Sequence, residues 1–201
     1  MSQFLSGIGP VTWAVLLWLS TYFIINIWVF IWRIIKLNDA INTERDSLEL
    51  IITGHTPLPK SILFNAFDSR KLNEKMLSVY RLQALSQATI GLSMLSIISS
   101  TAPFIGLFGT VVEILEAFYH LGGEGKVSFD IIAPIISKAL IATAFGILTA
   151  IPAYSFYIIL RRKVYQISSF LDMQVNFVVS GESRKNDFKI TLTKPNLDLN
   201  G

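Results

Sequence analysis

Three charged side chains lie within or beside long apolar stretches of the sequence. Glu113 and Glu116 follow an uncharged stretch at 82–112, and Lys138 is the one charge in 131–160. If these stretches cross a membrane, such charges are costly and must face a bundle interior, a water-filled cavity or an opposite charge. We therefore take all three as candidate functional residues.

Glu113 and Lys138 are predicted to form an ion pair. Glu113 lies about 7 residues, or ~10 Å of helix, before His120, and Lys138 lies about 8 residues, or ~12 Å, after Asp130. On antiparallel helices joined by the 120–130 loop, the two side chains would stand at a similar depth. The alternative is that both extend to the outer interface and never meet.

Two threonines are candidate pore-lining residues. Thr110 is one helical turn from Gly106 on one side and from Glu113 on the other, and Thr143 shares a helix face with Gly146. Such stripes of small and hydroxyl-bearing residues could line a narrow polar lumen. One chain of three membrane helices is too small to enclose a lumen, so an oligomer around a central axis is implied.

The other reactive residue types form no catalytic or metal-binding pattern. The absence of cysteine excludes disulfides, thiolate metal sites and a cysteine nucleophile. The histidines, His55 and His120, lie far apart in the sequence, and Ser137 and Lys138 are adjacent, so they do not face each other on a helix. We expect no enzyme activity, no metal and no cofactor.

Composition and hydropathy predict an all-α integral membrane protein. The chain has 201 residues, 52% of them hydrophobic and only 15% charged, with a mean hydropathy of +0.53. A soluble domain is about one-quarter charged. Segments of about 20 apolar residues cross a bilayer, which predicts three transmembrane helices at about 11–32, 88–119 and 131–160. The first has tryptophans near both ends and no basic start or cleavage site, so we expect it to be retained.

Basic residues indicate the orientation. Segment 33–86 contains eight Lys and Arg and segment 161–201 contains seven, against one in 120–130. By the positive-inside rule, the N-terminus is then periplasmic, the C-terminus cytoplasmic, and the segments 33–87 and 161–181 cytoplasmic. The net charge of +3 therefore reflects membrane orientation and not nucleic-acid binding.

The expected organisation is a single membrane domain over 1–181 and a polar, disordered tail over 182–201. Apolar residues at helical spacing ahead of the second span predict one helix from about 71 to 120, and the third helix is also expected to continue into the cytoplasm. Glycine and prolines at 54–59 predict a break in the chain.

Small residues distinguish the second and third spans from the first. The first span is rich in Trp, Phe and Ile, as expected for contact with lipid. Small residues let helices approach closely. The predicted helix-packing positions are Pro103, Gly106, Gly109, Pro134, Ala142, Gly146 and Pro152.

Two sequence blocks carry a family resemblance. The first is Ser100-Thr-Ala-Pro-Phe-Ile-Gly-Leu-Phe-Gly-Thr-Val-Val112, and the second is Ala133-Pro134 with Lys138-Ala-Leu-Ile-Ala-Thr-Ala-Phe-Gly146 and Ala150-Ile-Pro-Ala153. They resemble, in order and spacing, the second-span and third-span signatures of the MotA/TolQ/ExbB proton-channel family. Three spans with the predicted orientation are similar to the ExbB/TolQ branch.

The resemblance implies a homo-pentamer in the bacterial inner membrane, in contact with membrane lipid. It also implies a single-span partner of the ExbD/TolR type, as a dimer in the pore, whose membrane aspartate carries the proton. The proton motive force would then energise work at the outer membrane through a TonB- or TolA-like protein. No nucleic acid is implied as a partner. By position, the family's pore threonines correspond to Thr110 and Thr143.

Two positions depart from the family pattern. Lys138 stands where the family usually has Glu, and Glu113 stands where it usually has Gly. Relocation of the carboxylate, with Lys138 as its counter-charge, accounts for both changes together.

Other functions stay open from sequence alone. A non-conducting membrane scaffold would use the same small residues only for packing. A secondary transporter of small solutes is disfavoured by three spans without an internal repeat. The choice between ExbB and TolQ roles, and between proton and sodium coupling, is also open.

Overall fold

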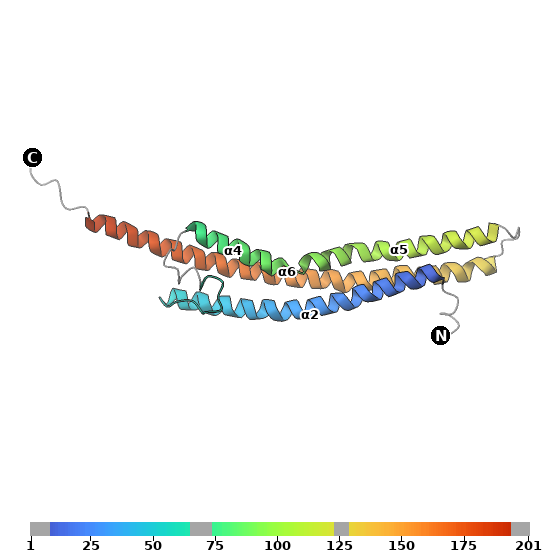
Figure 1. Cartoon of the computed structure of the whole chain (residues 1–201), viewed down its shortest axis with the longest axis horizontal. Coiled ribbons are helices and arrows are strands. Elements are labelled where there is room, and N and C mark those ends of the chain that lie inside the picture. The colour runs from blue at the N-terminus through green and yellow to red at the C-terminus, as the bar shows by residue number, and fades with distance from the viewer. Residues whose placement is uncertain (1–8, 65–73, 123–128, 194–201) are drawn as a thin grey trace, which may run out of the picture. The chain divides into compact units, whose positions relative to one another are not determined.

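The structure is a computed structural model that describes residues 9–64, 74–122 and 129–193. Within these ranges the ordered elements are all α-helices, as predicted (Figure 1). Three helical segments, Pro10–Ile52, Lys75–Tyr119 and Ile132–Ser180, are long and apolar enough to cross a membrane. The predicted three-span, all-α class is confirmed. The helices are α2 (Pro10–Ile52), α4 (Glu74–Thr89), α5 (Leu92–Gly122) and α6 (Phe129–Thr193).

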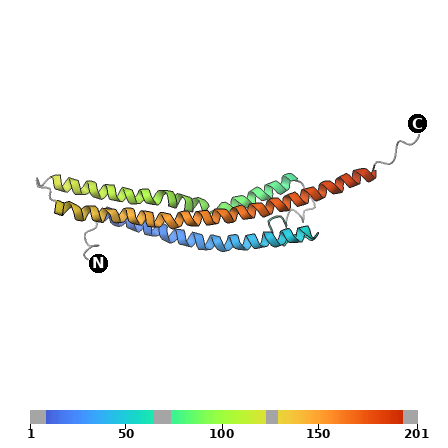
Figure 2. The ribbon, with the colours of Figure 1, turned by 180° about the vertical axis from the view of Figure 1, so that it is seen from behind.

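The chain divides into two compact units, which we describe separately. Unit 1 comprises Met1–Ile34 and Gly91–Arg161, and unit 2 comprises Ile35–Ile90 and Arg162–Gly201. In unit 1, α5 lies beside the first part of α6 (Figures 1 and 2), and Gly109 of α5 also lies close to Val15 of α2. A core of Val15, Leu19, Ala102, Ala142 and Ala150 joins the three helices.

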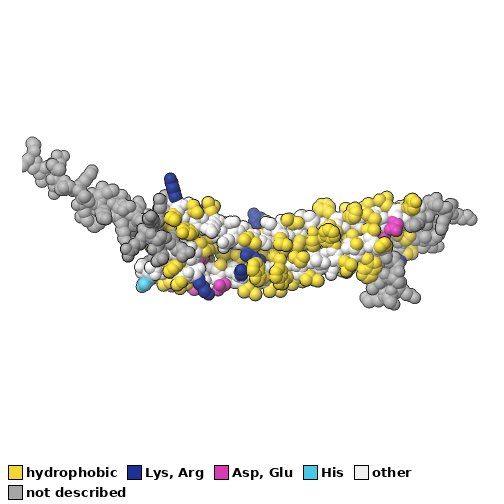
Figure 3. Space-filling view, viewed as in Figure 1, with side chains coloured by type: hydrophobic (Ala, Val, Ile, Leu, Met, Phe, Trp, Pro, Cys, Tyr) yellow, Lys and Arg dark blue, Asp and Glu magenta, His cyan; other side chains and the backbone are white. Residues whose placement is uncertain are grey.

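Large apolar side chains are exposed on unit 1, and they cover much of the face shown in Figure 3. Trp28, Phe104, Phe108 and Leu115 are all more than half exposed. A large contiguous apolar surface is unusual for a soluble monomer and marks a membrane or protein contact. Most of unit 1's bulky apolar residues therefore point outward, while alanines and glycines lie between its helices.

The predicted continuous helix over 71–120 is wrong at one point, because α4 and α5 are separate helices. Ile90 and Gly91 form a turn between them, and Gly91 has a φ of +88°. Residues with a side chain rarely adopt this left-handed conformation, so glycine is the default there. The Arg33 side chain also lies close to Gly91, with its Cγ 3.4 Å from the position a Cβ would take.

The predicted break at 54–59 is confirmed. The α2 helix ends with Gly54 at a φ of +85°, the His55 N–H donating to the Leu50 carbonyl and the Gly54 N–H donating to the Ile51 carbonyl. This is the Schellman ending of a helix, which requires the left-handed glycine. At the other end of the chain, α6 continues to Thr193, so helix extends into the expected tail at 182–201. Residues 194–201 lie outside the described residues.

A buried polar cluster of Glu44, Ser61, Ile62 and Gln174 stabilises unit 2. The Glu44 side chain is 1% exposed, and its carboxylate accepts hydrogen bonds from the Ser61 hydroxyl (3.0 Å), the Ile62 N–H (2.9 Å) and the Gln174 amide (3.0 Å). The same amide donates to the Glu44 carbonyl at 2.8 Å. The cluster thus joins α2, the segment after α2 and α6. No sequence pattern had pointed to it.

Loss of the Glu44 carboxylate is expected to destabilise unit 2. Glu44→Ala would leave the Ser61 hydroxyl and the Ile62 N–H without their acceptor and would remove one of the two acceptors of the Gln174 amide. We expect it to lower the free energy of unfolding by about 3 kcal/mol. Thermal unfolding in mild detergent, followed by circular dichroism, measures the effect. Glu49→Ala is the matched control, because Glu49 is exposed on the same helix. Equal melting of the two variants would show that the cluster adds no stability.

Candidate ion-conducting site

The α5 and α6 backbones touch where Gly106 meets Gly146. A Cβ on Gly106 would lie 2.6 Å from the Ala142 carbonyl oxygen, and a Cβ on Gly146 would lie 2.7 Å from the Ala102 carbonyl oxygen. Real Cβ atoms essentially never approach backbone so closely. Both positions therefore have to be glycine for the helices to cross at this distance.

This crossing brings Thr110 and Thr143 together. Their hydroxyl groups share a hydrogen bond, and the Thr110 hydroxyl also lies 3.2 Å from the Gly106 carbonyl oxygen and 3.3 Å from that of Ala139. Thr110 is buried, at 7% exposure, whereas Thr143 is partly exposed. The two candidate pore residues thus form one polar group, the threonine pair, in an otherwise apolar interface.

Glu113 lies one helical turn beyond Thr110 and is also buried, at 8% exposure. Its Oε2 accepts a hydrogen bond of 2.7 Å from the hydroxyl of Thr12, which is fully buried on α2. The first span therefore contributes a polar residue to the interior of unit 1. Its sequence, rich in large apolar residues, had indicated only lipid contact.

The carboxylates of Glu113 and Glu116 both lie near the beginning of α2. Glu116 Oε2 is 3.8 Å and Glu113 Oε1 is 4.0 Å from the position a Cβ on Gly9 would take. Glu116 itself is exposed. The start of a helix carries a partial positive charge, which stabilises nearby carboxylates. This contact gives both carboxylates a favourable electrostatic neighbour.

Lys138 is half-buried on α6, next to Ala139, whose carbonyl oxygen faces Thr110.

The ion pair of Lys138 with Glu113 stays a prediction, and a double-mutant cycle tests it. Glu113→Ala and Lys138→Ala should each weaken assembly or activity, because removing one partner of a buried pair leaves an uncompensated charge, at roughly 3–5 kcal/mol. The double variant should then lose much less than the sum. Glu113→Gly with Lys138→Glu, the usual family residues, should recover part of the loss, whereas strictly additive losses would mean that the charges do not meet.

The other predicted packing positions lie on the same two helices. Pro103 is inside α5, and Pro134 and Pro152 are inside α6. Gly109 faces both neighbouring helices: its Cβ would lie 3.1 Å from the Ala142 Cβ and 3.2 Å from a Val15 methyl group.

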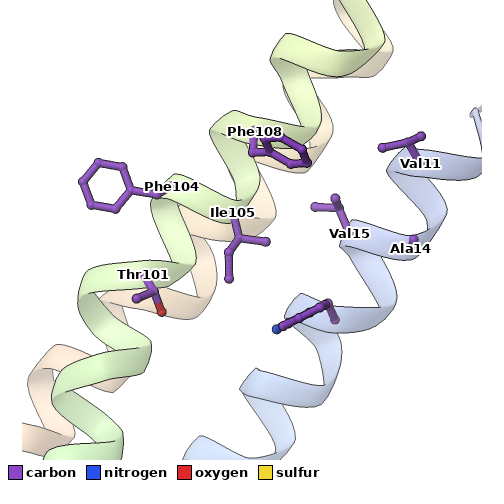
Figure 4. A pocket seen from close by; sticks show the side chains of 8 residues that line it. Val11, Ala14, Val15, Thr101, Phe104, Ile105 and Phe108 are labelled. Atoms are coloured by element: carbon purple, nitrogen blue, oxygen red, sulfur yellow. The ribbon is translucent and has the colours of Figure 1, made fainter.

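An apolar pocket of about 510 Å³ lies between α2 and α5 in unit 1 (Figure 4). Its one hydroxyl, that of Thr101, already donates to the Ile97 carbonyl at 2.8 Å. Such a pocket offers no ligand for an ion. It is lined by Val11, Ala14, Val15, Trp18, Thr101, Phe104, Ile105 and Phe108.

Other polar residues do not add a second site. No group of three or more potential metal ligands occurs among the residues that the structure describes. His55 is exposed in the turn after α2, and the His120 side chain lies outside the described residues. Asn26 is fully buried on α2, and no hydrogen-bond partner for its amide lies within the described part of the chain. Its position, like that of Thr12, has no signal in the sequence.

Comparison with known proteins identifies the family. Residues 60–173 match the MotA/TolQ/ExbB proton channel family. The chain belongs to this family. The ExbB-like 1 protein of Helicobacter pylori is 52% identical over 180 residues, covering 88% of this chain and 95% of that protein.

Shorter stretches of this chain match proteins named ExbB and a protein named TolQ. The biopolymer transport protein ExbB of Neisseria gonorrhoeae is 41% identical over 90 residues, covering 45% of this chain and 41% of that protein. The Tol-Pal system protein TolQ of Haemophilus influenzae is 48% identical over 63 residues, covering 31% of this chain and 28% of that protein. The chain is thus a proton-channel family member of the ExbB/TolQ type. With three helices able to span a membrane, it is a multi-pass inner-membrane protein of a channel family and not of an enzyme family.

Proposed function

We propose that this ExbB/TolQ-type protein is the channel subunit of an inner-membrane motor. The proton motive force would drive protons through it and energise TonB- or TolA-dependent work at the outer membrane. The observation that carries the proposal is the threonine pair at the α5–α6 crossing of a proton-channel family member.

The threonine pair has the hydrogen-bonding capacity that proton passage needs. A hydroxyl group has one proton to donate and two lone pairs that accept. When Thr110 donates to the Ala139 or Gly106 carbonyl and Thr143 donates to Thr110, the Thr143 oxygen can accept another hydrogen bond. A protonated carboxyl on a single-span partner of the ExbD/TolR type could then donate to the partly exposed Thr143.

A homo-pentamer around two copies of that partner supplies the lumen that one chain lacks. The apolar outer surface of unit 1 supports this assembly, because neighbouring copies and lipid can both cover it. The basic residues of α2 beyond residue 32, of α4 and of the second half of α6 support a cytoplasmic position for unit 2 and a periplasmic N-terminus.

Native mass spectrometry tests the assembly. The chain is expressed from its own genome segment, so that any single-span protein of the ExbD/TolR type encoded beside it is expressed too, and is purified in mild detergent. We expect five copies of this chain with two copies of the partner. A stable monomer under these conditions, with no single-span protein attached, would contradict the proposal.

A non-conducting scaffold is the second candidate, and one observation favours it. The Thr110 hydroxyl is buried and its hydrogen bonds are already made within the chain, as a purely structural residue would have them. Replacing threonine by valine removes the hydroxyl and keeps the shape of the side chain. This change should abolish the activity of a channel and leave a scaffold working normally.

A further inference from the structure

We propose that Glu113 carries protons between the outer side of the membrane and the threonine pair, and that Thr12 positions its carboxylate for this step. The inference rests on the proposed function, because it adds two residues to the same ion pathway. It assigns a proton-carrying group to this chain itself, in addition to the carboxylate expected on the partner.

The geometry in unit 1 supports the assignment. Glu113 is the carboxylate one helical turn from Thr110, it is 8% exposed, and its Oε2 lies 2.7 Å from the Thr12 hydroxyl oxygen. An ionisable side chain in a membrane span is costly to retain and marks ion pathways and proton relays. The hydroxyl comes from a different helix and is fully buried, so it holds the carboxylate at one depth and in one orientation.

The proton step balances with water and the partner as co-reactants. The ionised Glu113 carboxylate takes a proton from a hydronium ion on the outer side, forming an O–H bond and leaving a water molecule. The resulting acid gives that proton to a carboxylate on the partner's span near the threonine pair and becomes ionised again. Thr12 can serve both forms, because its hydroxyl donates to the carboxylate and can rotate to accept from the acid.

Charged groups on the neighbouring helices complete the surroundings of Glu113. On α5, Glu116 directs Oε2 toward the same Gly9 position as Glu113 Oε1 and places a second carboxylate at the outer end. On α6, Lys138 is the charge predicted at the same depth. The part of α2 in unit 1 has no charged side chain before Arg33 and contributes the Thr12 hydroxyl and the positive end of the helix.

Proton flux through the complete complex in lipid vesicles tests the proposal. The flux is measured at a fixed potential and a fixed pH. We expect Glu113→Gln to reduce the flux roughly a hundredfold, the scale of a lost acid–base group, and Glu113→Asp to retain much more of it. Thr12→Val should reduce the flux about tenfold, because the carboxylate loses the hydrogen-bond donor that orients it. Thr12→Ser, which keeps the hydroxyl but not the methyl group, should restore the flux, whereas a packing role would be preserved by valine.

Thr21→Val is the matched control, because Thr21 is exposed on the same helix and donates to its own Leu17 carbonyl. If the wild-type complex conducts and Glu113→Gln conducts equally well, the inference is overturned while the proposed function stands. If Thr12→Val conducts like the wild type, or if Thr12→Ser does not restore the flux, Thr12 does not position the carboxylate and that part of the inference is overturned. A wild-type complex without any flux overturns the proposed function and this inference with it. Should Glu113→Gln not assemble, the comparison of Thr12→Val with Thr12→Ser decides alone.

Discussion

Gly106→Ala is expected to separate α5 from α6 and to abolish a functional complex, although it adds one methyl group. That methyl carbon would lie 2.6 Å from the Ala142 carbonyl oxygen and 3.0 Å from the Thr143 Cα. Both are backbone atoms, so no side-chain rotation relieves the contact. Overpacking of this kind costs about 3 kcal/mol or more. Thermal unfolding in detergent and the yield of purified complex measure the loss.

Gly109→Ala is the matched control, made three residues later on the same helix. Its Cβ would lie 3.1 Å from the Ala142 Cβ and 3.2 and 3.3 Å from the two Val15 methyl groups, so each neighbour has to move by only a few tenths of an ångström. The gain in helix propensity from Gly to Ala, about 1 kcal/mol, offsets part of that smaller cost. We therefore expect Gly109→Ala to melt near the wild type. If the two variants melt at the same temperature, α5 and α6 do not approach each other at Gly106 as closely as the 2.6 Å contact indicates.

Thr110→Val and Thr143→Val are expected to abolish energised function while the complex still assembles. Valine keeps the shape of threonine and removes the hydroxyl, so packing changes little and the hydrogen-bonding group on the proposed path is lost. Growth or uptake that depends on the proton motive force, measured in a strain lacking the native gene, should fall at least about tenfold, which corresponds to about 1.4 kcal/mol, the scale of one lost hydrogen bond. Thr→Ser at either position should restore most of it.

Thr149→Val controls for the loss of a buried hydroxyl in general. Thr149 is 2% exposed on the same helix as Thr143, and its hydroxyl donates only to the Phe145 carbonyl of its own helix. We expect wild-type function from this variant. Normal function in both Thr110→Val and Thr143→Val would favour the scaffold over the channel.

Much of the fold could be predicted from hydropathy alone. Long apolar segments predict membrane helices whatever their tertiary contacts, because the bilayer requires them. The turn at Gly91 could not be located in this way, since a single glycine inside a helical pattern is often tolerated and only its φ of +88° reveals the interruption. The end of α2 at Gly54 was easier to predict, because prolines, which cannot continue a helix, follow the glycine within a few residues.

The candidate site was predictable where residues share a helix face. Spacing placed Thr110 near Gly106 and Glu113, and small residues indicated close helix contact around Gly146. Contacts between helices far apart in the sequence were not predictable. Thr12 and Glu113 are separated by 101 positions, and nothing in either local sequence selects the other as its partner. The same holds for Glu44 and Gln174, which are 130 positions apart.

Proton flux through the purified complex tests the proposed function most directly. This chain and the proposed single-span partner of the ExbD/TolR type are placed together in lipid vesicles, and proton entry is followed with a pH-sensitive dye after a potential is imposed. The proposed function predicts flux for the wild-type complex, and flux near that of protein-free vesicles for Thr143→Val in an equally intact complex. Equal flux from the wild-type complex and from protein-free vesicles would contradict it.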